Sequence, residues 1–367
     1  MNNHVTVLEI DANAVLHNLN YFKQKLNSTT KILAVVKAFG YGSDAIEVAK
    51  IVQKKVAYFA VAYAQEGIAL RKAGIKTPIL VLYPQIQNLA SVVDYFLEPN
   101  LYNFNIFDAF LKLADEKPLM NYPIHIKFNT GLNRLGFWHT DVPNIIAELK
   151  KSNHVKVQSI FSHLAASEDL NEQEFTIGQI NNFAFIVKQI YTHLGYEPLI
   201  HVLNTSGIVN YSKAQFDMVR LGIGLYGFGN TAEETANLKN THCLKSIISQ
   251  IHIVQPGETI GYNRAFVASQ TTRSAVIPVG HADGISRRLG NKNGFVIINN
   301  QTAPIIGNVC MDMIMVDVTK IDCNEGDKVI IFNHQQHIEY MAHKCETIPY
   351  EILTSLSQRI RRVVIDS

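Results

Sequence analysis

Short apolar runs alternate with amphipathic stretches along the first two thirds of the chain. Eight runs are rich in strand-forming residues, and gaps such as 64–74 and 107–116 repeat apolar residues every three or four positions, as helices do. Alternating strands and helices are typical of a parallel sheet, so the pattern predicts an α/β fold with a (β/α)8 TIM-like barrel over residues 9–235. The fourth run contains Pro99, which fits poorly inside a central strand. The runs cover residues 31–37, 58–62, 78–83, 98–104, 124–128, 159–164, 199–205 and 218–222.

The pattern changes after about residue 235. Apolar runs follow one another with turn-rich links such as PGE, GNKNG and NEGD, and few helical stretches separate them. This predicts a mostly-β C-terminal domain at 236–367, to which we assign an N-terminal strand at 1–8. The boundary falls in the polar segment 230–240. The runs cover residues 244–254, 274–280, 294–300, 313–318 and 328–332.

Composition narrows the classes of function. The 367 residues are 47% hydrophobic, which supports about two domains, and the net charge of +2 is too small to favour nucleic acid or an anionic membrane. No apolar stretch approaches the roughly 20 residues that span a bilayer, and no secretory signal is visible. The four cysteines lack disulfide or zinc spacing, so we expect reduced thiols in a cytoplasmic protein. His334 and His337 have a metal-like spacing without a further ligand, so we expect a surface turn there and no metal site.

Candidate chemistry lies where the barrel strands end. Lys37 ends the first strand, Arg134 lies in the loop after the fifth, His163 lies near the end of the sixth, the segment 204–207 (NTSG) ends the seventh, and Arg220 lies in the eighth. Each has an ordinary structural explanation, such as a lysine that reaches water or an arginine in a buried ion pair. The carboxyl ends of barrel strands meet at one mouth, where the active sites of this fold lie. Together, these residues therefore predict a catalytic mouth.

The loops after the seventh and eighth strands suggest an anion at that mouth. Residues 204–207 and 221–224 offer hydroxyls and backbone N–H groups to a phosphate, although the glycines could simply make turns. A phosphate facing Lys37 across the mouth suggests pyridoxal 5′-phosphate bonded to that lysine.

The sequence resembles the alanine racemase family, whose members are barrel-type (fold type III) pyridoxal-phosphate enzymes. The resemblance covers nearly the whole chain. It implies a barrel with a β-domain, a homodimer with shared active sites, and interconversion of L-alanine and D-alanine that supplies peptidoglycan synthesis. The motifs are AVVKAFGYG (34–42), KFNTGLNRLG (127–136), FSHLA (161–165), NTSG (204–207), VRLGIGLYG (219–227), GETIGYNRAF (257–266), GHADGISR (280–287), GNVCMD (307–312) and TIPYEIL (347–353).

The resemblance also implies roles for individual residues. Lys37 and the partner subunit's Tyr262 would act as bases on opposite faces of Cα. Arg220 would face the pyridine nitrogen of the cofactor, with His163 between Arg220 and the tyrosine. Lys127 matches a lysine that is carbamylated in many members. The remaining implied cofactor contacts are Tyr41, Asn204, Thr205, Gly222, Ile223 and Tyr350; the substrate contacts are Arg134 and the partner's Met311 and Asp312.

Several positions depart from the family pattern. Asn129 and Leu132 replace an aspartate and a methionine near Lys127, and Phe39 and Gly40 replace Asn-Ala after the catalytic lysine. His281 and Asn308 replace a tyrosine and an arginine that are common in the family.

Three other functions are weighed against this one. A non-catalytic pyridoxal-phosphate protein would lack the second domain and Tyr262. A barrel-type decarboxylase would place an acid where Arg220 stands. A serine or broad-specificity racemase stays open, because a few pocket residues decide side-chain preference.

Overall fold

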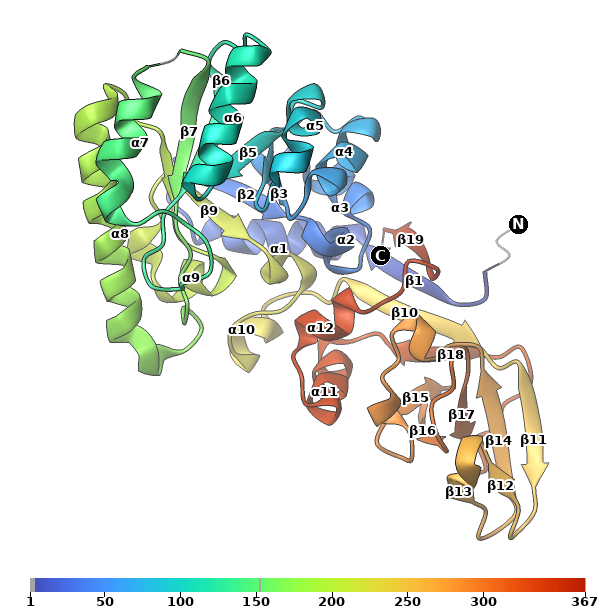
Figure 1. Cartoon of the computed structure of the whole chain (residues 1–367). Helices are drawn as coiled ribbons and strands as arrows, with labels where there is room; N and C mark the ends of the chain where they lie inside the picture. Colours follow the sequence, from blue (N-terminus) through green and yellow to red (C-terminus); the bar gives the residue numbers. More distant parts are fainter. Residues whose placement is uncertain (1–3, 152, 367) are drawn as a thin grey trace.

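The structure is a computed structural model that describes residues 4–151 and 153–366. It consists of a barrel of parallel strands and a second body built on a larger sheet (Figure 1). Residues 1–3 of the expected N-terminal strand and the final residue, 367, lie outside the described part. Among the described helices, none has the length and apolar character needed to cross a membrane.

Eight parallel strands form the barrel in the order β8-β7-β6-β5-β4-β3-β2-β9, which confirms the predicted (β/α)8 arrangement. The ring closes between β8 and β9, where Asp217 N donates to Ile200 O at 3.2 Å and Arg220 N donates to Leu203 O at 3.0 Å. The strands are β2 (Lys31–Val35), β3 (Tyr58–Val61), β4 (Ile79–Val81), β5 (Glu98–Leu101), β6 (Tyr122–Lys127), β7 (Val155–Phe161), β8 (Leu199–His201) and β9 (Met218–Leu221).

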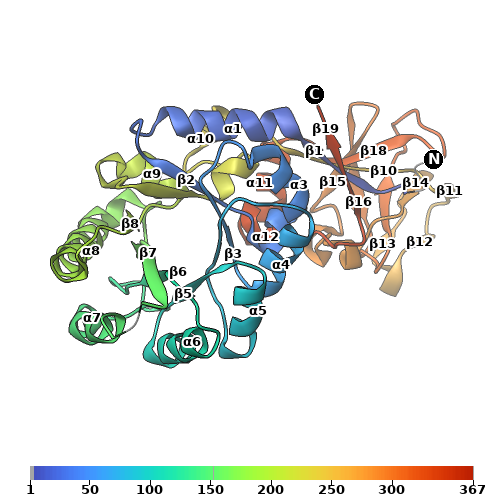
Figure 2. The ribbon, with the colours of Figure 1, turned by 90° about the horizontal axis from the view of Figure 1, so that it is seen from above.

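Helices surround the barrel strands (Figure 2). Helix α6 illustrates why they form. The Asn103 side chain accepts a hydrogen bond from Ile106 N at the start of the helix, and the buried residues Ile106, Phe107, Phe110 and Ala114 lie on one face. The helices are α1 (Ala12–Gln24), α2 (Lys37–Tyr41), α3 (Ala45–Val52), α4 (Ala64–Lys72), α5 (Leu89–Asp94), α6 (Phe104–Glu116), α7 (Val142–Leu149), α8 (Gln173–Leu194), α9 (Thr205–Asn210) and α10 (Ala232–Ala236).

The second body is built on a nine-stranded sheet in the order β11-β14-β17-β16-β15-β18-β10-β1-β19. Strand β1, from the start of the chain, pairs with β10 antiparallel and with β19 in parallel, so both ends of the described chain join this sheet. Its elements, with the hairpin β12-β13, are β1 (Val7–Asp11), β10 (His242–Ile247), β11 (Gln250–Val254), β12 (Thr259–Ile260), β13 (Phe266–Val267), β14 (Thr272–Ile277), β15 (Phe295–Ile298), β16 (Gln301–Ile306), β17 (Ile314–Asp317), β18 (Lys328–Phe332), α11 (Gln335–Cys345), α12 (Pro349–Thr354) and β19 (Arg361–Ile365).

Some local expectations were wrong. The run at 244–254 is two strands, β10 and β11, and the sequence pattern missed β16 and β19. The expected surface turn at His334 is instead the start of α11, where the His334 side chain accepts from Gln336 N. The doubtful fourth barrel strand does form, with Pro99 opposite Val81 in the short strand β5.

Candidate active site

One cavity opens at the carboxyl ends of the barrel strands, and it gathers most of the residues expected at the site. Among its lining residues are Lys37, Tyr41, Lys127, Arg134, His163, Asn204, Thr205, Arg220, Gly222, Ile223 and Tyr350. Residues from segments far apart in sequence therefore meet at one mouth, as the barrel topology predicts.

Lys37 enters the cavity from an unusual turn just beyond β2. The next four residues, 38–41, all have left-handed backbone angles, with φ between 53° and 62°. Only Gly40 among them adopts such angles without steric cost, and each of the others is strained by about 1–2 kcal/mol. A Cβ on Gly42, at φ 83°, would lie 2.0 Å from Leu353 O, so only glycine fits there.

Long-range contacts hold this strained turn. The Glu66 carboxylate accepts a hydrogen bond from Ala38 N at 2.7 Å. The Arg362 guanidinium donates to Gly42 O at 2.9 and 3.0 Å and lies over the Phe39 ring at 5.2 Å. Phe39, a departure from the family pattern, thus covers the arginine that fastens the loop of Lys37 to the C-terminal strand.

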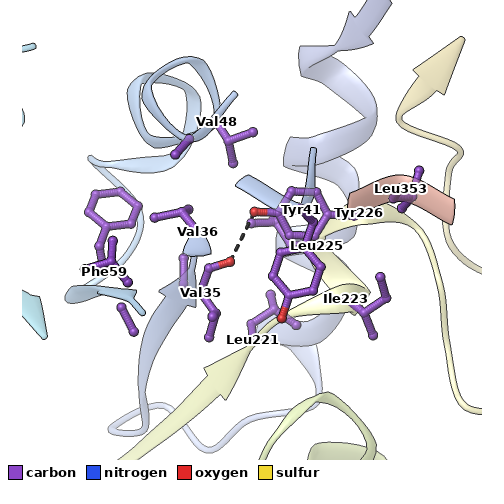
Figure 3. Close-up of a cluster of buried hydrophobic side chains, with 14 of the residues drawn as sticks. Val35, Val36, Tyr41, Val48, Phe59, Leu221, Ile223, Leu225, Tyr226 and Leu353 are labelled. Carbon is purple, nitrogen blue, oxygen red and sulfur yellow. Dashed lines mark hydrogen bonds between the residues drawn. The ribbon is translucent and has the colours of Figure 1, made fainter. Parts of the chain in front are cut away.

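One part of the cavity is lined with hydroxyl groups. The Tyr41 ring stacks on Tyr226 at 4.6 Å, and the Tyr226 hydroxyl donates to Val35 O at 3.1 Å (Figure 3). A Cβ on Gly222 would lie 2.7 Å from the Tyr41 hydroxyl, so glycine is needed for this approach. Thr205 Oγ1 accepts from Gly222 N at 3.1 Å, which leaves the threonine O–H as a donor.

Two tyrosines in this part of the cavity stay protonated. Burial is the main cause that raises the pKa of Tyr41 well above its ordinary value, and burial raises the pKa of Tyr350 to about 12. Both hydroxyls are therefore neutral donors near pH 7. The nearby Asn204 has a structural role, because its Oδ1 accepts hydrogen bonds from Gly207 N at 2.9 Å and from Ser167 Oγ at 2.8 Å.

Arg220 is buried at the floor of the cavity. Its Nη1 donates to His201 Nδ1 and its Nη2 to His163 Nδ1, both at 2.9 Å, and further bonds go to the backbone carbonyls of Ser162, His201 and Val202. Burial lowers the Arg220 pKa to about 10, so the group remains charged. Among the described residues no acceptor is recorded for its Nε–H, which leaves that donor for the cavity.

His163 is an uncharged imidazole. Burial, followed by the charge of Arg220, holds its pKa well below 6.5. Because Arg220 can only donate, His163 Nδ1 accepts, and its single proton lies on Nε2.

Lys127 is a second buried basic residue in the cavity wall. Burial, then the charges of Arg134 and Arg220, lower its pKa to about 7, so much of the amine is uncharged at neutral pH. Asn100, which also lines the cavity, has a buried Oδ1 without a partner among the described residues. A buried oxygen without a partner at the cavity wall can accept a hydrogen bond from a bound group.

Asn129 shapes the loop that carries Arg134. Its Oδ1 accepts from Gly131 N at 3.1 Å and from Asn133 N at 3.0 Å, and its Nδ2 donates to Asn133 Oδ1 at 2.9 Å. The replacement of the family's aspartate keeps the acceptor oxygen and adds a donor.

Tyr262, Met311 and Asp312 lie elsewhere. They line a second hollow, on the body with the nine-stranded sheet, and Tyr262 is 72% exposed. The neighbouring hairpin β12-β13 lies at the end of the molecule away from the barrel (Figure 1). One chain therefore does not bring Tyr262 and Lys37 together.

Comparison with known proteins identifies the family. The model of the alanine racemase N-terminal domain matches residues 10–229, and the model of the C-terminal domain matches 241–364. The alanine racemase of Thermodesulfovibrio yellowstonii is 35% identical over 97% of both chains. This chain belongs to the alanine racemase family.

Solved structures of alanine racemases have the same fold. The enzyme from Clostridium difficile is 32% identical, with a TM-score of 0.94, and the match covers 100% of this chain and 97% of the other. The enzyme from Bartonella henselae, solved with covalently bound pyridoxal phosphate, is 29% identical, with a TM-score of 0.87 and coverage of 99% and 100%. The alanine racemase family depends on this cofactor.

The barrel cavity fits that group. Lys37 supplies an amine, Arg220 supplies a free N–H for a ring nitrogen, and the neutral hydroxyls of Tyr41 and Tyr350 suit a phosphate. The space beside Gly222, which a Cβ would fill, leaves room next to these hydroxyls.

The sequence analysis missed several residues of the cavity. Tyr83 lies with its ring centroid 6.0 Å from Lys37 Nζ, and Phe161 stacks on His201 at 4.8 Å. Asn100, an amide inside a barrel strand, was the one sequence signal available. The apolar and aromatic lining residues look like ordinary core in sequence.

Proposed function

We propose that this chain interconverts L-alanine and D-alanine in a homodimer, with one base from each subunit at every site. The main support for a site shared by two subunits is the separation of Lys37 and Tyr262 in a single chain. Each belongs to a motif of the family, but they line different hollows of one chain. A second copy, arranged head to tail, brings Tyr262 of the partner subunit to the barrel mouth.

The chemistry needs a proton to leave one face of Cα and another to arrive on the opposite face. Pyridoxal phosphate, when bound, supplies an electron sink that makes the Cα proton of the amino acid removable. Lys37 Nζ takes or returns the proton on its face, and the hydroxyl of the partner's Tyr262 does so on the other. His163 contributes an Nε2–H at the floor between Arg220 and the mouth.

Other residues bind and orient. When the cofactor is bound, the hydroxyls of Tyr41, Thr205 and Tyr350 would hold its phosphate, together with Asn204, Gly222 and Ile223. Arg220 would offer its Nε–H to the pyridine nitrogen. Arg134 binds the substrate carboxylate, Lys127 carries a carbamate that steadies Arg134, and the partner's Met311 and Asp312 close the pocket.

The wider assignments follow from the same proposal. The product D-alanine serves peptidoglycan synthesis, and the reaction takes place in the cytoplasm, in keeping with four cysteines that are all free thiols. We assign the barrel, up to residue 235, to the cofactor-binding domain, and residues 236–367 with β1 to the domain that supplies Tyr262. The expected start of the barrel at residue 9 moves to Ala12, because β1 (Val7–Asp11) pairs with β10 and β19 of the second sheet.

Mixing two inactive variants tests the shared site. Lys37→Ala and Tyr262→Phe are each expected to abolish most activity in an assay coupled to D-alanine. Random exchange of subunits places both changes in one site and leaves the other intact, so about a quarter of wild-type activity should return. Lys54→Ala, an exposed lysine, controls for charge loss.

Absence of recovery, with exchange confirmed by mass tags, would contradict the shared site. Faster racemisation of L-serine than of L-alanine by the wild-type protein would favour a serine or broad-specificity enzyme instead.

A further inference from the structure

A row of polar side chains crosses the barrel interior and ends at Arg220. The five residues lie on five successive strands, β5 to β9. Each is at most 8% exposed. They are linked from one end by bonds of 2.8 Å (Glu98 Oε2 to His125 Nε2), 2.6 Å (His125 Nδ1 to Ser159 Oγ), 3.0 Å (Ser159 Oγ to His201 Nε2) and 2.9 Å (His201 Nδ1 to Arg220 Nη1).

The direction of the two bonds nearest Arg220 follows from chemistry. A guanidinium has no acceptor, so Arg220 donates and His201 Nδ1 accepts. Burial and the charge of Arg220 hold the His201 pKa well below 6.5, so the ring has one proton, on Nε2. That proton is donated to Ser159 Oγ.

The remaining bonds follow from satisfying every donor. Ser159 already accepts from His201, so its hydroxyl proton is directed to His125 Nδ1. If His125 Nδ1 were protonated instead, no acceptor for the Ser159 hydroxyl is recorded among residues 4–151 and 153–366. His125 therefore carries its proton on Nε2 and donates it to the Glu98 carboxylate.

The direction of these hydrogen bonds helps to compensate the buried positive charge of Arg220. The recorded hydrogen-bond partners of Arg220 are carbonyls and uncharged imidazoles, so no carboxylate of the described residues is bonded to its buried charge. Glu98 provides a carboxylate at the far end of the row. Arg71 lies in electrostatic range of Glu98, but the hydrogen bonds recorded for Arg71 go to backbone carbonyls. A buried cation without compensation is costly, and a polarised row of bonds lowers that cost.

We propose that Glu98, His125 and Ser159 are positioning residues of the active site. Through four hydrogen bonds, all donating toward Glu98, they fix the tautomer of His201 and hold Arg220 with Nε–H turned to the cofactor. None of them touches the substrate. The inference rests on the proposed placement of the pyridine nitrogen at Arg220.

Imidazole NMR of histidine-labelled protein tests the row without any racemase assay. In the wild-type protein, both with and without pyridoxal phosphate, we expect Nε2 of His125 and His201 to be protonated and both Nδ1 atoms to be bare acceptors. Glu98→Gln keeps an acceptor oxygen but removes the charge, and should shift the Nε2–H signals of both histidines. A protonated His125 Nδ1 in the wild-type protein, or a shift confined to His125, would overturn the proposal.

Kinetics of the holoenzyme provide the second measurement. Ser159→Ala should lower kcat by about tenfold, the scale of one buried hydrogen bond lost, with little change in the KM for alanine. Ser159→Thr restores the hydroxyl and should restore kcat. Ile160→Val, a buried neighbour on β7 outside the row, controls for loss of packing.

Equal kcat for Ser159→Ala and Ile160→Val would show that the row stabilises the fold but does not position Arg220 for catalysis. Because the spectrum is read without substrate, failure of the row is distinguishable from failure of the racemase assignment.

Discussion

The two halves of the candidate site differ in how far a single chain completes them. In the barrel half, Arg220 is 5% exposed, and its Nη atoms are occupied by hydrogen bonds. In the other half, Tyr262 is 72% exposed and Met311 59% exposed. Folding of one chain therefore builds the barrel cavity, whereas Tyr262, the second base of the proposed mechanism, would join a site only in the proposed dimer.

The exposed half is nevertheless held in place. Met311 O accepts from Ala282 N, and Cys310 O accepts from His281 N, both at 2.9 Å. A Cβ on Gly280 would lie 2.4 Å from Met311 O, so glycine alone permits this contact. The Asp312 carboxylate is fixed by Arg359 at 2.7 Å. This surface is thus already ordered in the single chain, and in the proposed dimer that order would lower the entropy cost of association.

Tyr262→Phe is the strongest test of whether each half of the site supplies one base. Racemisation should fall by about 10²–10⁴-fold, the usual worth of one general base. Lys37 still serves its own face, so the Cα hydrogen of one enantiomer alone should exchange with deuterium in D2O, measured by mass spectrometry. Tyr340→Phe, which removes a surface hydroxyl bonded to Asn293 O, is the matched control. Equal exchange from both enantiomers would mean that the two faces do not have separate bases.

The barrel half was also the more predictable from sequence, for a physical reason. Parallel strands bring their carboxyl ends to one edge, so the positions of Lys37, His163 and Arg220 along the chain already implied a common mouth. Tyr262 carries no such signal, because an exposed tyrosine in a turn looks like any surface residue. Only the resemblance to a family singled it out.

Other features need three dimensions. The left-handed angles of Ala38 and Phe39 depend on Glu66 and Arg362, which are far away in sequence. The row from Glu98 to Arg220 depends on strand register, which places Ser159 beside His125. Neither follows from local pattern or propensity.

Gly222→Ala tests the fit of the barrel half to its cofactor. The added Cβ would lie 2.7 Å from the Tyr41 hydroxyl, whose ring is backed by Tyr226. Such overpacking costs about 1–3 kcal/mol, so affinity for pyridoxal phosphate should fall by roughly 10- to 100-fold in a fluorescence titration. Gly178→Ala, where an added Cβ meets nothing within 4 Å, should bind normally. If Gly222→Ala binds pyridoxal phosphate with unchanged affinity, the phosphate does not lie beside Gly222 and Tyr41.

Carbamylation of Lys127 is expected to have a smaller effect, and it tests the chemistry of the barrel half. With a pKa of about 7, the amine is mostly uncharged above pH 7 and can add CO2, forming an N–C bond and releasing a proton. A carbamate signal from ¹³C-bicarbonate should therefore appear by NMR at about pH 8 and fade at about pH 6. Lys127→Met should lack the signal and show a severalfold higher KM for alanine. A signal equal at both pH values would contradict the lowered pKa.

Asn308→Ala should have the smallest effect, and it tests whether the exposed half must be preformed. Asn308 Nδ2 donates to Tyr262 O at 3.0 Å, beside Asn263 at φ 59°. Loss of one such bond is worth about 1 kcal/mol, so kcat/KM should fall by about fivefold while affinity for pyridoxal phosphate is unchanged. Asn293→Ala removes a similar bond, to Arg288 O at 3.1 Å, and should be silent. If Asn308→Ala is equally silent, association itself orders Tyr262, and the rigidity of the isolated surface has no part in catalysis.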